Sequence, residues 1–257
     1  MNEQRYPLLE DLHVLRTAAL TSIRDRAFDA LPLYYAEYSD GIVSGCGISI
    51  NRDSLTVEPG IVRHGGFMYF LRQPMPLTYA PTEEYMILKL RFGMPQETES
   101  FLERSLRLVL SPDMDVHPDE MELARFKLKS GAILRTKYTD FFDRVTEFNT
   151  VNVIHSPYAA IGRSTLHPEV VAAFAKEAAA YQLEPLDEAF CLAALQNLPV
   201  AYEQVAFYLR RRLKQDTAEF DNEGLYQGLC QVLREVQTGG RIAMGRAHRA
   251  RREVYVD

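Results

Sequence analysis

LTVEPGIV (residues 55–62), HGGFMYFL (residues 64–71) and EYMILKLRFG (residues 84–93) are the stretches of sequence that decide the fold. Short apolar runs alternate there with Pro-Gly and Gly-Gly turns, which is typical of a compact antiparallel β-domain. The predicted strands are residues 33–39, 42–50, 54–57, 61–63, 67–71, 77–79, 85–92, 101–110 and 122–129. The stretch 101–110 also fits a helical period through Phe101, Ser105 and Leu108, so both interpretations stay open there.

Helical patterns flank this β-region. Leu8, Leu12, Leu15, Ala19 and Ile23 form one apolar stripe, which predicts a helix over residues 8–28. Pro32 disfavours helical geometry at the residue before it, so we expect the helix to end in residues 29–32.

A second helical region follows the strands. His167-Pro168, Pro185 and Pro199 each predict the start of a helix, because Pro is favoured at the first helical position. Asn222 is expected to cap a fourth helix, which Gly239 closes. The connections between these helices are short enough for a small bundle.

These patterns together predict an α+β chain. The expected parts are an N-terminal helix (residues 1–30), an antiparallel β-sandwich-like or barrel-like domain (31–154), a small helical bundle (163–240) and a basic tail (241–257). Residues 153–164 are the predicted linker, because the patterning changes there from turn-rich strands to helices that begin at Pro.

Composition restricts the classes of function. The chain has 257 residues and a net charge of −6, which disfavours a general nucleic-acid binder. Cys46, Cys191 and Cys230 show no metal-binding spacing and are expected to be buried free thiols in a reducing cytoplasm. The polar N-terminus and the absence of a long apolar run predict a soluble protein without an export signal or a membrane span.

One acidic loop resembles a calcium site without completing it. Asp113, Asp115 and His117 lie close together, but Pro118 and Ala124 stand where a calcium loop needs Gly and Glu. We therefore expect a solvated turn, and we expect the protein to hold no metal or organic cofactor.

No catalytic motif is recognisable. His64-Gly65-Gly66 resembles an oxyanion loop, but that function needs a G-x-S-x-G nucleophile, which the sequence lacks. No G-x-G-x-x-G pattern precedes a helix. We expect no catalytic residues and no enzymatic activity.

Two kinds of residue are candidates for an interface. Tyrosine is enriched in protein interfaces, although tyrosine also packs commonly in strands. Arginines can contact phosphates or an acidic partner, although arginines near a helix end also complement the helix dipole. The candidates are Tyr34, Tyr35, Tyr38, Tyr69, Tyr79, Arg210, Arg211, Arg212, Arg246, Arg249, Arg251 and Arg252.

The β-region also resembles a known class of proteins. A Gly-containing strand (residues 45–50), a VEPG turn (57–60), the aromatic strand GFMY (66–69) and the segment LARFKLKSG (123–131) occur in that order. This order resembles the N-terminal modules of phage tail, baseplate and fibre-attachment proteins. The resemblance covers about residues 33–135 and implies a structural protein of a virion, a prophage tail or a contractile-injection-type particle, made in the bacterial cytoplasm.

The resemblance implies a non-enzymatic adaptor that docks on other tail or baseplate proteins, with a homo-oligomer as a further option. A nucleic-acid-associated or regulatory protein that uses residues 210–212 and the basic tail is the second hypothesis. A hydrolase with scattered catalytic residues is the third.

Overall fold

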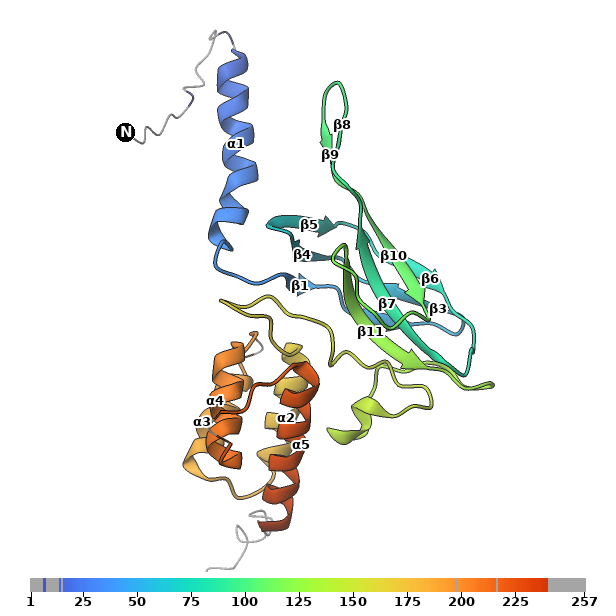
Figure 1. The fold of residues 1–257 in the computed structure, drawn as a ribbon, viewed down its shortest axis with the longest axis vertical. Coiled ribbons are helices and arrows are strands. Elements are labelled where there is room, and N and C mark those ends of the chain that lie inside the picture. Colours follow the sequence, from blue (N-terminus) through green and yellow to red (C-terminus); the bar gives the residue numbers. More distant parts are fainter. Residues whose placement is uncertain (1–6, 8–13, 15, 197, 216, 240–257) are drawn as a thin grey trace, which may run out of the picture.

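The structure is a computed structural model that describes residues 7, 14, 16–196, 198–215 and 217–239. A long helix comes first, strands follow, and four helices end the described chain (Figure 1). In chain order the elements are α1 (Thr17–Tyr34), β1 (Gly41–Gly45), β2 (Ile48–Ile50), β3 (Ser54–Val57), β4 (Gly60–His64), β5 (Phe67–Leu71), β6 (Met75–Thr78), β7 (Tyr85–Phe92), β8 (Gln96–Glu97), β9 (Leu102–Glu103), β10 (Leu106–Ser111), β11 (Glu120–Lys127), the 3₁₀ helix η1 (Phe142–Val145), α2 (Pro168–Ala178), α3 (Pro185–Ala194), α4 (Tyr202–Leu213) and α5 (Asn222–Gly239).

The first six strands form one bent antiparallel meander. Its two halves are the sheets β1-β4-β5 and β2-β3-β6, and the chain bends where it passes from one half to the other. Gly45 and Cys46 sit at one bend with φ values of 67° and 59°. A Cβ at Gly45 would lie 2.2 Å from the Pro59 carbonyl oxygen, so only glycine allows the two bent segments to approach this closely.

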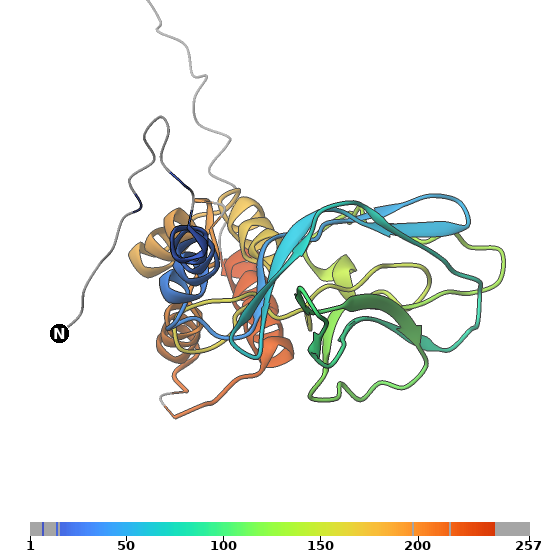
Figure 2. The same cartoon turned by 90° about the horizontal axis from the view of Figure 1, so that it is seen from above.

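A second antiparallel sheet, β10-β7-β11, has β7 at its centre. Residues 87–90 of β7 are buried on both faces of this sheet. One face supplies Leu88, Leu90 and Phe92 to a hydrophobic core that it shares with Leu55 and Val62 of the meander. The two sheets are therefore the layers of one β-core (Figure 2).

The four C-terminal helices enclose a second core. His167 accepts a hydrogen bond from the Glu169 amide and so caps α2. Phe190 of α3 and Tyr208 of α4 stack with their ring centroids 4.0 Å apart, and aliphatic residues of α5 pack into the same core. Burial of these apolar stripes holds the short helices together.

The segment between the two cores is tied to both. Ile154 belongs to the helical core, whereas Tyr158 packs in the β-core and bridges to Ile42 of β1. Phe141, well before the predicted linker, also packs among the helices. Within residues 153–164, the backbone of Pro157 and Ala159 pairs with Ile42 of β1, and the Ser156 carbonyl accepts from the side-chain amide of Asn222 in α5.

The predicted α+β class agrees with the structure, which has small antiparallel sheets and, among the described residues, no closed barrel. Three predictions were wrong: the strand over residues 33–39, the end of the first helix within residues 29–32, and Asn222 as a helix cap. Residues 33–39 are not a strand, because α1 continues through Pro32 to Tyr34. Pro32 lies in the last turn, where its missing N–H removes one bond from a helix that is about to end. The last helix is capped by Asp221, which accepts from the Gly224 amide, and Asn222 is instead its first residue.

Other elements have boundaries that differ from the predicted ones, and some of the predicted residues lie outside the described part of the chain. The stretch predicted as 101–110 is divided into β9 and β10, which removes the helical alternative there. The helix predicted to begin at Pro199 begins at Tyr202. Leu8, Leu12, Leu15 and the tail 241–257 lie outside the described residues.

Candidate protein-docking surfaces

Helix α1 stands clear of the rest of the described chain (Figure 1). It buries none of its residues, and the element that it touches most is β5. Large apolar side chains lie open along it: Leu20, Ile23, Phe28, Leu33 and Tyr34, the last 74% exposed. An exposed apolar set of this size marks a surface that a partner covers.

The sequence of α1 does not stabilise it by itself. The Arg16 N-cap has no side-chain hydrogen bond, the first turn carries no acid and the last turn no base. Pro32 removes a further backbone bond. Most of the stability of a protein helix comes from tertiary packing of its apolar face, so α1 depends on packing against something else.

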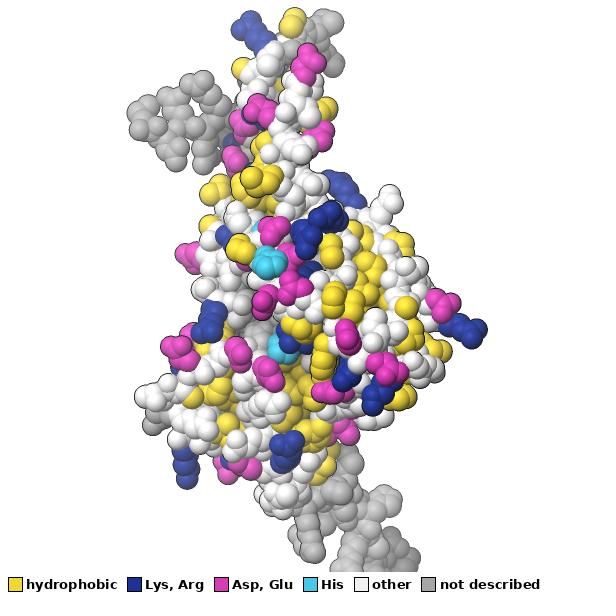
Figure 3. Space-filling view, turned by 45° about the vertical axis from the view of Figure 1, so that its right-hand side comes forward, with side chains coloured by type: hydrophobic (Ala, Val, Ile, Leu, Met, Phe, Trp, Pro, Cys, Tyr) yellow, Lys and Arg dark blue, Asp and Glu magenta, His cyan; other side chains and the backbone are white. Residues whose placement is uncertain are grey.

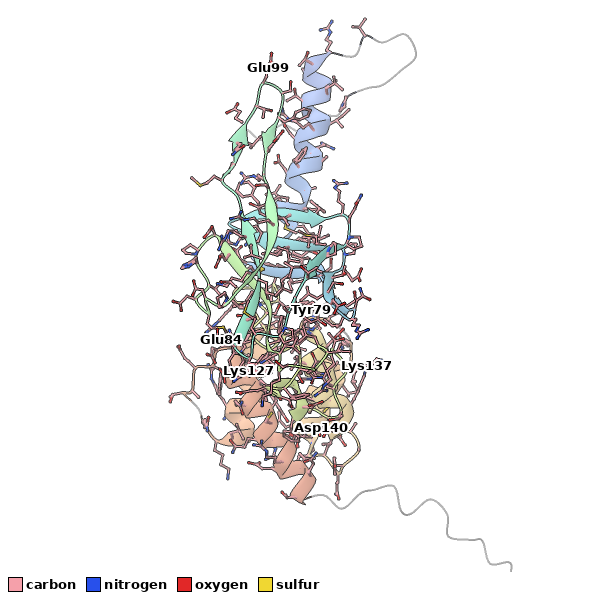
Figure 4. The ribbon with its side chains drawn as sticks, turned by 90° about the vertical axis from the view of Figure 1, so that its right-hand side faces the viewer. Tyr79, Glu84, Glu99, Lys127, Lys137 and Asp140 are labelled. Atoms are coloured by element: carbon pink, nitrogen blue, oxygen red, sulfur yellow. The ribbon has the colours of Figure 1, made fainter. Side chains whose placement is uncertain are left out.

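The β8–β9 hairpin is a second projecting arm at the same end of the molecule (Figure 4). Thr98 closes its turn by donating to the Phe101 carbonyl and accepting from the Phe101 amide, at 3.0 and 3.1 Å. Met94, Phe101 and Leu102 are 84%, 69% and 63% exposed. A two-stranded hairpin is at best marginally stable in isolation, so this arm also lacks packing.

Strand β5 lies at the base of the two arms. Phe67 and Phe70 are each exposed on this edge strand, and the Arg104 guanidinium at the foot of the hairpin lies 3.3 Å from the Phe67 ring centroid. We call the exposed apolar residues of α1, β5 and the β8–β9 hairpin the distal surface. Figure 3 shows apolar side chains that continue from the sheets toward the projecting arms.

The helical region carries a second exposed apolar group, which we call the helical surface. It consists of Leu192 on α3, Leu195 and Leu198 in the following connection, and Phe207 on α4. The Arg211 guanidinium lies 5.6 Å from the Phe207 ring centroid. Arginine beside an exposed aromatic ring is a common composition for a protein interface.

The predicted tyrosines are divided between surface and core. Tyr34, Tyr35 and Tyr38 form an edge-to-face series with centroids 5.0 and 4.9 Å apart, at the junction of α1 with the sheets. Tyr69 is buried and packs 4.8 Å from Phe92, which gives it a core role. The Tyr79 hydroxyl donates to the carbonyls of the β2–β3 turn.

The predicted arginines of α4 also serve different roles. Arg210 donates to the Ala218 carbonyl at 2.8 Å, and Arg212 donates to the carboxylates of Asp187 and Glu235. Arg211 extends outward over Phe207. Arg246, Arg249, Arg251 and Arg252 lie outside the described residues.

The acidic loop is organised around a buried ion cluster. Glu120 accepts from Lys89 Nζ at 3.0 Å and from Arg91 Nε at 2.8 Å, and its side chain is fully buried. Lys89 also donates to the Asp115 carbonyl. Within the described residues, no three His, Cys, Asp or Glu side chains are grouped in a way that could hold a metal ion.

Two small cavities lie between the β-core and the helices. One, of about 350 Å³, is lined by Cys46, Ser156 and His167, and the other, of about 380 Å³, by Arg125, Thr150 and His155 among others. Burial lowers the pKa of His167 to about 4, so at neutral pH its uncharged ring caps α2 through Nδ1 and contacts the Tyr158 hydroxyl at 3.2 Å. These contacts give His167 a structural role.

The sequence pattern does not predict the exposed hairpin, because Phe101 and Leu102 resemble core residues of a strand. The acidic turn 97–100, which contains Thr and Ser, is the sequence feature that indicates an exposed hairpin there.

Among the described helices, none combines the length and the hydropathy needed to cross a bilayer.

Comparison with known proteins ends in distant structural neighbours. No protein-family model and no curated protein matches this chain. A chain of the TssK-TssF-TssG baseplate subcomplex of the type VI secretion system, solved by cryo-electron microscopy, matches with a TM-score of 0.43 and 12% identity over 92% of this chain and 100% of that one. The crystal structure of TssK matches with a TM-score of 0.40 and 9% identity over 92% of this chain and 72% of that one. These structural neighbours are baseplate proteins, and the TM-scores show that their structural likeness to this chain is distant.

Proposed function

We propose that this chain is a non-enzymatic structural adaptor of a tail-type or baseplate-type assembly, made in the bacterial cytoplasm and built into the particle by protein–protein docking. The observation that carries the proposal is α1, a helix of 18 residues that buries none of its own side chains. The resemblance of residues 33–135 to phage tail and baseplate modules indicates the kind of assembly.

The distal surface has the composition of a docking site. Many of its members are aromatic, and aromatic residues and methionine are enriched at the cores of protein interfaces. Covering one such side chain contributes about 1.5–3 kcal/mol before the costs of association. Several exposed side chains on one end of the molecule can therefore support a specific complex.

The helical surface lies on the other part of the molecule, away from the projecting arms (Figure 1). An adaptor needs two surfaces of about 800 Å² each to hold two partners stably. The position of α1 and the β8–β9 hairpin at one end, with α3 and α4 toward the other, suits a protein that joins two different neighbours.

The nucleic-acid hypothesis has less support from the described residues. Arg210 and Arg212 are engaged within the protein, which leaves Arg211 as the outward cation of this cluster. A single arginine beside an overall negative chain is a weak phosphate-binding surface.

Co-expression tests the proposal. The chain is produced with the products of its neighbouring genes, and the complexes are measured by size-exclusion chromatography with light scattering. We expect Phe28→Ser with Leu33→Ser to abolish one complex and leave the other, and Phe207→Ser to do the reverse. Both sets are exposed in the free chain, so the fold is retained and circular dichroism confirms it. A wild-type chain that binds none of these products and turns over a small substrate would overturn the proposal.

A further inference from the structure

We propose that helix α1 of one copy of this chain packs on the β8–β9 hairpin of a second copy. The inference rests on the proposed function, because it names a second copy as the partner of one part of the distal surface, whereas Phe28 and Leu33 lie outside that part and stay open to another partner. Both arms project from the same end, and Figures 1 and 2 show them apart, so neither covers the other within one chain.

Five apolar side chains of α1 form a stripe along one face, and Phe28 and Leu33 lie about 100–120° from its centre. Leu20, Ile23, Ala27, Ala30 and Tyr34 follow one another at spacings of three and four residues, which is the pattern of a helix that packs along one seam. Alanine in the middle of the stripe lets a partner backbone approach closely. All five residues are exposed in the described chain.

The basic residues of α1 lie nearer to this stripe than the acidic residues do. At about 100° per residue, Arg16, Arg24 and Arg26 lie within about 90° of the centre of the stripe. Asp25 and Asp29 lie more than about 120° from that centre. The seam is therefore bordered by cations, and two copies of α1 placed seam to seam would bring arginines together. Arg24 also pairs with Asp25, and Arg26 also has an interaction within the chain.

The hairpin offers the complementary composition. Its apolar residues Phe101 and Leu102 lie among three carboxylates, and residues 94–103 contain no Lys or Arg. The carboxylates are Glu97, Glu99 and Glu103. Figure 4 shows Glu99 at the tip of the hairpin. An acidic and apolar arm thus matches a basic and apolar seam, and opposite charges around an apolar centre set the register of an interface.

Such a contact is heterologous, since each copy offers a helix to one neighbour and a hairpin to another. Contacts of this type close into a ring when the rotation between copies allows it. The contact also supplies the packing that both arms lack, because a lone hairpin is marginal in water and a helix gains most of its stability from packing.

Charge reversal tests the pairing. The hairpin variant is Glu97→Lys, Glu99→Lys and Glu103→Lys, and the helix variant is Arg16→Glu, Arg24→Glu and Arg26→Glu. We expect the wild type to self-associate in light scattering, and each variant alone to raise the dissociation constant by at least about 100-fold, because like charges then face each other. Glu84→Lys, an exposed change far from the arms, is the matched control and stays associated.

Mixing the two variants distinguishes the mechanism. The hairpin variant keeps its basic helix and the helix variant keeps its acidic hairpin, so the mixture should recover an assembly with equal amounts of both chains. A wild type that stays monomeric up to high concentration overturns the inference, as does a hairpin variant that associates like the wild type. The proposed function is judged separately by complexes with neighbouring gene products, which form or fail to form whatever the result for self-association.

Discussion

Replacement of Glu120 by glutamine is expected to destabilise the β-core. The Glu120 carboxylate is fully buried and accepts from Lys89, from Arg91 and from the His117 amide. Lys89 is itself 1% exposed, so the loss of the carboxylate leaves a buried ammonium group without its counter-charge. The same carboxylate holds the loop before β11 through the His117 amide, and Lys89 of β7 donates to the Asp115 carbonyl of that loop.

The expected loss of unfolding free energy can be obtained in two ways. Burial raises the pKa of Glu120, but the hydrogen bonds from Arg91 and Lys89 outweigh burial and lower the pKa from 4.5 to about 2. This lowering corresponds to about 3 kcal/mol of unfolding free energy at neutral pH. Removing one partner of a buried ion pair costs about 3–5 kcal/mol. We therefore expect Glu120→Gln to lower the free energy of unfolding by about 3 kcal/mol at pH 7.

Urea titration followed by circular dichroism measures the change. A carboxyl group whose pKa is lowered on folding stabilises fully above pH 4.5, and this contribution is lost as the pH falls toward about 2. The difference between wild type and Glu120→Gln should therefore shrink to about half or less at pH 3. Glu84→Gln, at an exposed carboxylate, is the control and should change stability by less than about 0.5 kcal/mol. A loss below about 1 kcal/mol at pH 7, or an equal loss at both pH values, would show that the cluster is not stabilising as described.

Three further changes test the packing. Gly45→Ala should lower the free energy of unfolding by at least about 2 kcal/mol, because φ is 67° and the new Cβ would lie 2.2 Å from the Pro59 carbonyl oxygen; an unchanged urea midpoint would contradict this. Tyr208→Phe should cost about 1–2 kcal/mol, since it removes the 2.9 Å hydrogen bond to the buried Asp187 carboxylate, and thermal unfolding that matches the wild type would refute it. Burial raises the pKa of Cys46 to about 12, so a thiol reagent at pH 8 should modify it slowly until urea is added; equal rates in native and unfolded protein would disprove its burial.

Local pattern was sufficient for most of the strands. Residues 54–57, 67–71 and 85–92 were predicted with the boundaries that β3, β5 and β7 have, because alternation and Gly or Pro turns act over a few residues. The prediction failed at residues 33–39, where aromatic residues favour a strand but α1 continues. Helix propagation through Pro32 depends on the preceding turns, which a local strand propensity does not include.

The candidate surfaces depended on long-range packing. Tyr34 and Tyr69 are equivalent in the sequence as aromatic residues near turns, yet one is 74% exposed and the other 8%. The difference arises because Phe92, a residue of another sheet, covers Tyr69, whereas the Tyr34 ring contacts its sequence neighbour Tyr35 and stays 74% exposed. The amino-acid sequence by itself determined most of the helices, strands and turns, through interactions between near neighbours. Tertiary structure alone decided which apolar side chains are left open to a partner, because burial depends on residues that are far apart in the chain.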